Sequence, residues 1–69
     1  MIPEINKSYL IAYKGQFEYD GYIGAAKCVG QGSYDQTWGE ILYPFDLLEE
    51  PFSKECFFSE KDVKSEIKI

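Results

Sequence analysis

The pattern of apolar and polar residues along this chain divides it into short segments with the length and periodicity of β-strands. Residues 22–30 are apolar almost throughout and are bounded by turn residues at both ends. Two glycines inside this segment would cost a helix about 2 kcal/mol relative to alanine, and a helix this short is marginal. We therefore predict that residues 22–30 form the central and most buried strand. Its one charge, Lys27, indicates that the opposite face is the inner one, formed by Tyr22, Gly24, Ala26 and Cys28.

Residues 8–13 also alternate as a strand, and both of its faces are apolar enough to be covered by other parts of the protein. One face carries Tyr9, Ile11 and Tyr13, and the other carries Leu10 and Ala12. Residues 14–16 supply a turn signal, and the pair at 20–21, Asp-Gly, is favoured in tight hairpins. We expect a hairpin that leads from residues 17–19 into the central strand.

Residues 30–36 are the most polar and glycine-rich stretch, and we expect them to form a mobile loop. Residues 37–45 resume as a strand, with Trp38, Glu40 and Leu42 outward and Gly39, Ile41 and Tyr43 inward. Pro44 should end the ladder or hold an edge, because it has no N–H to donate. Two structures remain open for residues 46–50. One is a helical turn with Asp46 as its N-cap, stopped by Pro51, and the other is an acidic loop above two leucines.

The last third of the chain predicts a strand, a tight turn and a closing strand. Residues 55–58 form the brief strand, after which Ser59 caps a single turn with Asp62 three residues on. Residues 63–69 alternate, with Val63, Ser65, Ile67 and Ile69 on one face and Lys64, Glu66 and Lys68 on the other. Together these segments predict a small five-stranded barrel, closed or nearly closed, with a short helical turn before the last strand. In so curved a sheet, Gly24 and the alanines after it let a ring or another strand approach closely.

Length and composition limit the architecture to one domain spanning residues 1–69. With 45% hydrophobic and 17% aromatic residues, the chain is too apolar to be a disordered acidic tail. Cys28 and Cys56 lack metal-binding spacing, and we interpret both as small buried hydrophobic residues with free thiols, which predicts a reduced, cytoplasmic protein. The sequence has neither a signal-peptide pattern nor an apolar run of membrane-spanning length, so we expect neither secretion nor membrane insertion.

Charge is distributed unevenly along the chain. Seven lysines stand against twelve acids, with no arginine or histidine, and residues 40–62 carry the whole net charge of −5. This balance disfavours contact with nucleic-acid phosphates and favours a protein partner with a basic surface, although a merely solvated face is the plainer interpretation. The candidate acidic face comprises Glu40, Asp46, Glu49, Glu50, Glu55, Glu60 and Asp62.

The twelve aromatic residues outnumber what so small an interior can hide, so some of them should lie on the surface. We select Tyr19, Tyr22, Tyr34 and Trp38 as candidates for a peptide groove or a cage around a cation. The alternative is that Tyr22 and Trp38 belong to the core, because a barrel of this size needs every ring it can bury.

Catalytic chemistry finds little support in these residues. There is no histidine, and no serine, cysteine or lysine lies beside a recognisable base, so we do not expect an enzyme. Glu49 and Glu50 are adjacent acids without a third ligand-spaced oxygen, which makes a poor metal site. Residues 30–32 are Gly-Gln-Gly, but the lysine and hydroxyl residue of a phosphate-binding loop are missing. We predict no catalytic residue, metal or cofactor.

The order of these segments resembles that of SH3-like small barrels, most closely in the Phe-Phe-Ser-Glu-Lys-Asp-Val stretch at residues 57–63. That stretch is similar to the aromatic and acidic turn that closes many SH3-like and Tudor-like domains. The chain lacks the Ala-Leu-Tyr-Asp-Tyr opening and the paired tryptophan of true SH3 domains, so a polyproline-binding role is not implied. In size, acidity and lack of a catalytic set, the chain also resembles the small proteins that bacteriophages direct against host systems.

These observations lead us to expect a non-enzymatic protein-binding module. Its most concrete form is a small acidic phage-type inhibitor that binds a host defence or nucleic-acid-processing protein in the host cytoplasm, without direct contact with nucleic acid or membrane. One alternative is a small adaptor or structural subunit of a larger cellular complex. Another is a binder of a small molecule or peptide through the surface aromatic residues.

Overall fold

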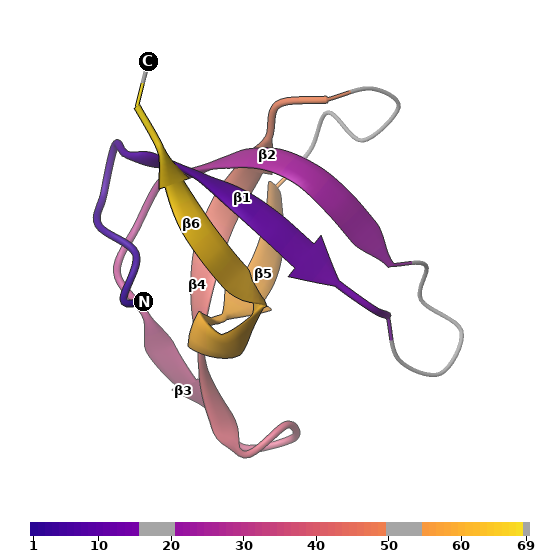
Figure 1. Cartoon of the computed structure of the whole chain (residues 1–69). Coiled ribbons are helices and arrows are strands. Elements are labelled where there is room, and N and C mark those ends of the chain that lie inside the picture. Colours follow the sequence, from indigo (N-terminus) through magenta and orange to yellow (C-terminus); the bar gives the residue numbers. More distant parts are fainter. Residues whose placement is uncertain (16–20, 50–54, 69) are drawn as a thin grey trace.

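The computed structural model of the chain describes residues 1–15, 21–49 and 55–68, which form an all-β protein (Figure 1). Its elements in chain order are β1 (Ser8–Tyr13), β2 (Tyr22–Cys28), β3 (Ser33–Asp35), β4 (Glu40–Leu47), β5 (Glu55–Ser59), the 3-10 turn η1 (Glu60–Asp62) and β6 (Val63–Ile67). The predicted all-β class and the helical turn before the last strand are therefore confirmed. The expected hairpin piece at residues 17–19 lies outside the described residues.

The strands form one antiparallel sheet in the order β3-β4-β2-β1-β6, with β5 on the other edge of β4 (Figure 1). β1 and β2 pair along their whole length, from Ser8 opposite Lys27 to Tyr13 opposite Tyr22. β5 and β6 are consecutive in sequence but lie at opposite edges, and η1 joins them while contacting both β1 and β4. The described residues contain no ladder between β5 and β6, so the sheet is open and a closed barrel is not confirmed.

β3 accounts for the sixth strand where five were predicted. Five residue steps separate Cys28 from Ser33, whereas three steps separate their partners Phe45 and Leu42 on β4. Two extra residues therefore leave the ladder as a bulge between β2 and β3. β2 and β3 are one interrupted strand along β4, and the stretch predicted as a loop contains β3.

Pro44 lies inside β4, so it does not end the ladder, which was one of the two outcomes predicted for it. It pairs with Phe57 of β5, and its carbonyl accepts a hydrogen bond from the amide of Val29 at 2.9 Å. The nitrogen of Pro44 points to the same side of β4 as this carbonyl, toward the bulge between β2 and β3. Because the ladder is already interrupted there, the N–H that proline lacks leaves no strand carbonyl without a donor. A Cβ on Gly30 in the bulge would come within 2.8 Å of the proline ring, so glycine there makes room for it.

β4 continues through Asp46 and Leu47, so a helical turn beginning at Asp46, one of the two structures left open for residues 46–50, does not form. Asp46 pairs with Lys27 of β2 on one edge and with Glu55 of β5 on the other, so ladder hydrogen bonds replace those of a turn. Leu47 is buried but Leu48 is 49% exposed, so only one of the two leucines is covered.

A bulge also changes which residues of β6 face the core. Val63 lies opposite Ile11, but the next pair is Ser65 opposite Leu10, so the register shifts by one residue. Such a shift moves every later side chain to the other face. Val63 is buried, while Ser65 and Ile67 share the outer side with Leu10, which corrects the predicted common face for Val63, Ser65 and Ile67.

The core gathers around the ring of Phe58. The rings of Tyr13, Phe45 and Tyr22 lie with centroids 5.5, 5.7 and 6.1 Å from it. The predicted inner face of β2 is confirmed, and the other members of the core cluster come from β1, β4 and β6. A Cβ on Gly24 would lie 2.9 Å from the Tyr22 hydroxyl and would overlap the Glu49 carboxylate, which confirms that this glycine permits close approach.

The segment before β1 folds back on the end of β2. The amide of Asn6 donates to the carbonyl of Cys28, and the amide of Cys28 donates to the carbonyl of Lys7, at 2.8 and 2.9 Å. The hydroxyl of the buried Tyr9 accepts from the amide of Glu4 at 2.8 Å. These bonds pair backbone groups that would otherwise be left open at the end of the strand.

The thiol of Cys28 is buried, that of Cys56 is partly buried, and both are free. Within the described part of the chain, no helix has the length and apolar character needed to cross a membrane.

Candidate partner-binding face

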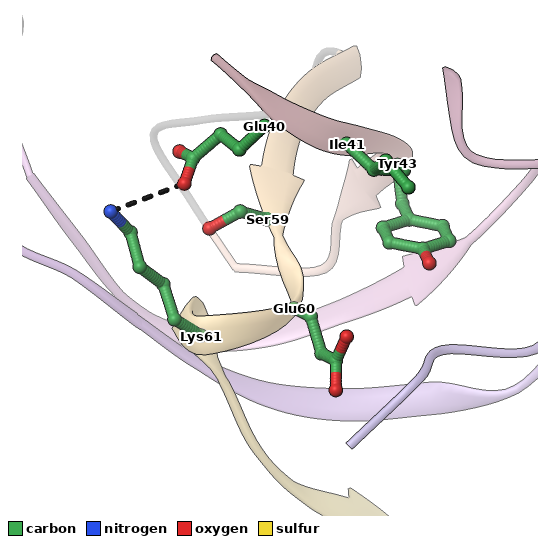
Figure 2. Close-up of a pocket in the computed structure, with 6 residues that line it drawn as sticks. All are labelled: Glu40, Ile41, Tyr43, Ser59, Glu60 and Lys61. Atoms are coloured by element: carbon green, nitrogen blue, oxygen red, sulfur yellow. Dashed lines mark ion pairs between the residues drawn. The ribbon is translucent and has the colours of Figure 1, made fainter. Parts of the chain in front are cut away.

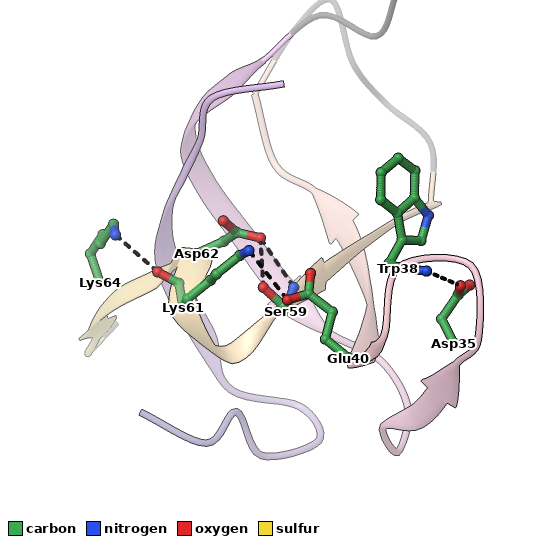
Figure 3. Close-up of polar contacts among 7 residues, drawn as sticks. All are labelled: Asp35, Trp38, Glu40, Ser59, Lys61, Asp62 and Lys64. Atoms are coloured by element: carbon green, nitrogen blue, oxygen red, sulfur yellow. Dashed lines mark hydrogen bonds and ion pairs between the residues drawn. The ribbon is translucent and has the colours of Figure 1, made fainter. Parts of the chain in front are cut away.

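The turn between β3 and β4 is organised by Asp35. Its carboxylate accepts a hydrogen bond from the amide of Trp38 at 3.0 Å (Figure 3), and its carbonyl accepts one from the amide of Gly39 at 2.8 Å. Gly39 has a φ of +69°, a conformation that glycine adopts without strain. The local sequence thus specifies a turn in place of the predicted start of a strand at residue 37, and the turn carries Trp38 at its tip.

An exposed ring and an exposed aliphatic side chain lie side by side on this hairpin. Tyr34 on β3 is 65% exposed and lies directly opposite Ile41 on β4, which is 49% exposed. Ile41 was expected to point into the core. It lies on the same side of β4 as Tyr43 and Phe45, but beyond the part of β4 that pairs with β2, and it remains half-exposed there.

The four candidate aromatic residues do not form one cluster. Tyr22 lies in the core, where its hydroxyl donates to the carbonyl of Ala25 at 2.7 Å, as the core alternative anticipated. Tyr34 and Trp38 lie on the hairpin, and Trp38 retains 37% exposure. Tyr19 lies outside the described residues.

The buried position of Tyr22 also affects its acidity. Burial raises the pKa of Tyr22 above its ordinary value of 10.0, and the negative charge of Glu49 raises it further. Both causes disfavour the tyrosinate anion, so this hydroxyl stays protonated and keeps its hydrogen bond to Ala25.

A shallow pocket of about 200 Å³ adjoins Ile41 at the end of β4 (Figure 2). β4 contributes one side of it, and the end of β5 with η1 contributes the other. Ser59 at its floor is only 3% exposed, and its hydroxyl donates to the carboxylate of Asp62 at 3.1 Å. The lining consists of Glu40, Ile41, Tyr43, Ser59, Glu60 and Lys61.

Two carboxylates of the predicted acidic face lie at this pocket, and each already has a cationic neighbour. Glu40 pairs with Lys61 at 3.2 Å (Figures 2 and 3). Glu60 lies 3.5 Å from the amino group of Met1. The pair of Met1 with Glu60 is solvent-exposed and that of Lys61 with Glu40 is partly so, and such pairs contribute little to stability.

The other predicted acids lie in different places. Asp62 is engaged with Ser59 in η1, and Asp46 lies at the far end of β4 beside Lys27. The carboxylate of Glu49 lies over Gly24. Glu50 and the side chain of Glu55 are outside the described set. The structure thus places Glu40 and Glu60 close to the hairpin, whereas Asp46 and Glu49 lie elsewhere.

Sequence reasoning missed the pairing of Tyr34 with Ile41 and the part that Tyr43 and Ser59 play in the pocket. The available signal was the Asp35-to-Gly39 turn, which predicts a hairpin and hence a register for the residues on either side. We name the surface made by Tyr34, Ile41 and the pocket residues the hairpin face.

Among the described residues, no three or more cysteine and acid side chains are grouped so that they could hold a metal ion. Comparisons of the chain with protein-family models, with curated proteins and with solved structures found no match.

Proposed function

We propose that this chain is a non-enzymatic protein-binding module and that the hairpin face is its binding surface. The observation that carries the proposal is the exposed pair Tyr34 and Ile41 beside a pocket. A solvent-exposed ring next to an aliphatic side chain gains from burial in an interface, and tyrosine is enriched among the residues that dominate binding.

The partner that suits this face has a basic surface. The chain has a net charge of −5, and within the described residues the pocket carboxylates of Glu40 and Glu60 form ion pairs with Lys61 and with the amino group of Met1, respectively. A lysine or arginine of a partner can replace these neighbours and bring its aliphatic stem against Ile41. In its most concrete form, the protein is a phage-type inhibitor of a host defence or nucleic-acid-processing protein.

We also propose that the open sheet is an SH3-like barrel that is incompletely closed. Its support is the succession of β5, η1 and β6, in which a single 3-10 turn connects the two outer strands of the sheet. A meander whose last strand returns beside the first has the curvature of such a barrel.

Site-specific photocrosslinking tests the proposed binding surface. A photoreactive phenylalanine analogue at position 34 should capture a discrete protein in cells that express the full chain. The same analogue at Lys68, an exposed position just after β6, is the matched control. Unlabelled wild-type protein should compete with the capture, whereas a Tyr34→Ala/Ile41→Ala variant that folds normally should not. Equal capture from both positions, or equal competition by the variant, would contradict the assignment.

A further inference from the structure

A second apolar surface lies on the outer side of the sheet, away from the hairpin face. Ala12 lies opposite Ile23, Leu10 lies opposite Ala25, and the amide of Leu48 donates to the carbonyl of Ala25 at 3.0 Å. Side chains in adjacent strands at such positions share one face. Ile23 is 78% exposed, Leu48 is 49% exposed and Leu10 is 39% exposed. The outer apolar patch comprises Leu10, Ala12, Ile23, Ala25 and Leu48.

Leu10 is the residue that departs most clearly from expectation here, because both faces of β1 were predicted to be covered. Instead, the described residues leave the outer face of β1 and β2 without a covering layer. An exposed isoleucine and two exposed leucines on adjoining strands are unlike the singly scattered apolar residues of an ordinary surface, and they indicate an interaction site.

Two opposite charges lie one row farther along the same face. Lys27 on β2 pairs in register with Asp46 on β4, next to the row that contains Ala25 and Leu48. Neither side chain makes an ion pair or hydrogen bond with any other residue in the described ranges. One cation and one anion, side by side at the margin of an apolar patch, form a charge pattern that is complementary to itself.

We propose that two copies of this chain associate through the outer faces of β2 and β4, which carry Ala25 and Leu48 of the outer apolar patch, about a two-fold axis parallel to the strands and located between these two strands. Such an axis places β2 of each copy over β4 of the other and leaves each row of side chains facing the same row. Lys27 then meets Asp46 of the second copy, and the reciprocal pair forms at the same time. In the adjacent row, the small side chain of Ala25 receives Leu48 of the second copy.

Self-complementary charge is the reason to choose a second copy over an unrelated partner. A wholly acidic or wholly basic partner would meet one of the two charges with the wrong sign, whereas an identical chain satisfies both in one step. This association goes beyond the proposed function because it uses a different surface and leaves Tyr34 and Ile41 accessible.

Charge reversal combined with mixing tests the proposal on the full chain. Analytical ultracentrifugation at physiological salt should show the wild type shifting from its monomer mass of 8.0 kDa toward twice that mass as its concentration rises to about 1 mM. Lys27→Glu alone and Asp46→Lys alone each set like charges against each other twice in the dimer. Each should weaken association at least about tenfold.

An equimolar mixture of the two single variants should associate again, because position 27 of each now meets an opposite charge at position 46 of the other. A Lys27–Asp46 contact within one chain cannot produce this rescue. Lys64→Glu, the same change on β6, should leave association unchanged, and circular dichroism confirms that every variant is folded. A wild type that stays monomeric at the highest concentration, or a mixture that fails to associate, would overturn the proposal and leave the patch to another kind of macromolecule.

Discussion

The carboxylate of Asp62 accepts two hydrogen bonds from Ser59, one from its backbone amide and one from its hydroxyl, each at 3.1 Å (Figure 3). Ser59 is the one buried polar residue among those described, so these bonds satisfy donors that water does not reach well. They also hold the turn that carries the chain from β5 to β6.

We expect Asp62→Ala to lower the free energy of unfolding by about 1–3 kcal/mol, because it leaves both donors of Ser59 without their acceptor. Urea denaturation monitored by circular dichroism measures this loss. Glu60→Ala removes an exposed acid from the same turn and should change stability by only about 0.5 kcal/mol. Equal losses for the two variants would mean that Asp62 contributes only its charge.

Gly24→Ala should destabilise the protein by about 1–3 kcal/mol, because its Cβ would lie 2.9 Å from the hydroxyl of the buried Tyr22 and overlap Glu49. The Glu49 side chain is exposed and can move aside, so adding Glu49→Ala should recover only part of the loss. As a matched glycine control, Gly39→Asn should be nearly neutral, since its Cβ meets no atom within 4 Å and asparagine tolerates a positive φ. A thermally stable Gly24→Ala variant would show that Tyr22 relaxes easily.

The stability contributed by Tyr22 should depend on pH in the alkaline range. Its pKa is raised in the folded protein, so above pH 10 the unfolded chain binds fewer protons than the native one. The contribution is therefore fully present below pH 10 and is lost as pH rises through the higher native pKa. Paired denaturation curves at pH 8 and at about pH 11 should show the wild-type advantage over Tyr22→Phe shrinking. A constant difference would contradict the raised pKa.

The bulge in β6 predicts unequal effects for two residues that simple alternation treats as equivalent. Val63→Ala removes buried methyl groups beside Ile11 and should cost roughly 2 kcal/mol. Ile67→Ala deletes a larger side chain from the outer side and should cost only about 1 kcal/mol or less. Chemical denaturation of both variants measures the two losses in stability, and a larger loss at Ile67 would place its side chain in the core.

Deletion of residues 63–69 should abolish cooperative unfolding, because it uncovers the edge of β1.

Binding kinetics should separate the charged and aromatic parts of the hairpin face once its partner is in hand. Glu60→Lys should slow association, with an effect that fades as salt shortens the screening length below about 8 Å. Tyr34→Ala should instead speed dissociation at all salt concentrations, because a buried ring acts after water is excluded. Glu66→Lys makes the same charge change on β6 and controls for net charge. If Glu60→Lys slows association no more than Glu66→Lys does, the carboxylate of Glu60 has no specific role in binding.

Local chemistry was sufficient to predict several features before any tertiary information. Ser59 and Asp62 lie at capping spacing, Gly24 sits among small residues, and the one lysine in β2 marks the outer face. Each of these features depends on residues only a few positions apart, so it can be predicted from the local sequence alone.

The features that sequence did not predict depend on pairing between distant strands. Alternation in the sequence by itself determined an all-β chain, the inner face of β2 and the tight turn before β6. Only the tertiary structure decided that β2 is interrupted by a bulge opposite Pro44, that a second bulge turns Ile67 outward, and that Tyr34 meets Ile41 on an exposed hairpin. The physical reason is that a strand has a period of two, so one extra residue, as in β6, reverses every later side chain, whereas two, as between β2 and β3, interrupt the ladder without reversing it. Where such residues are inserted is set by hydrogen bonds to a partner strand elsewhere in the chain.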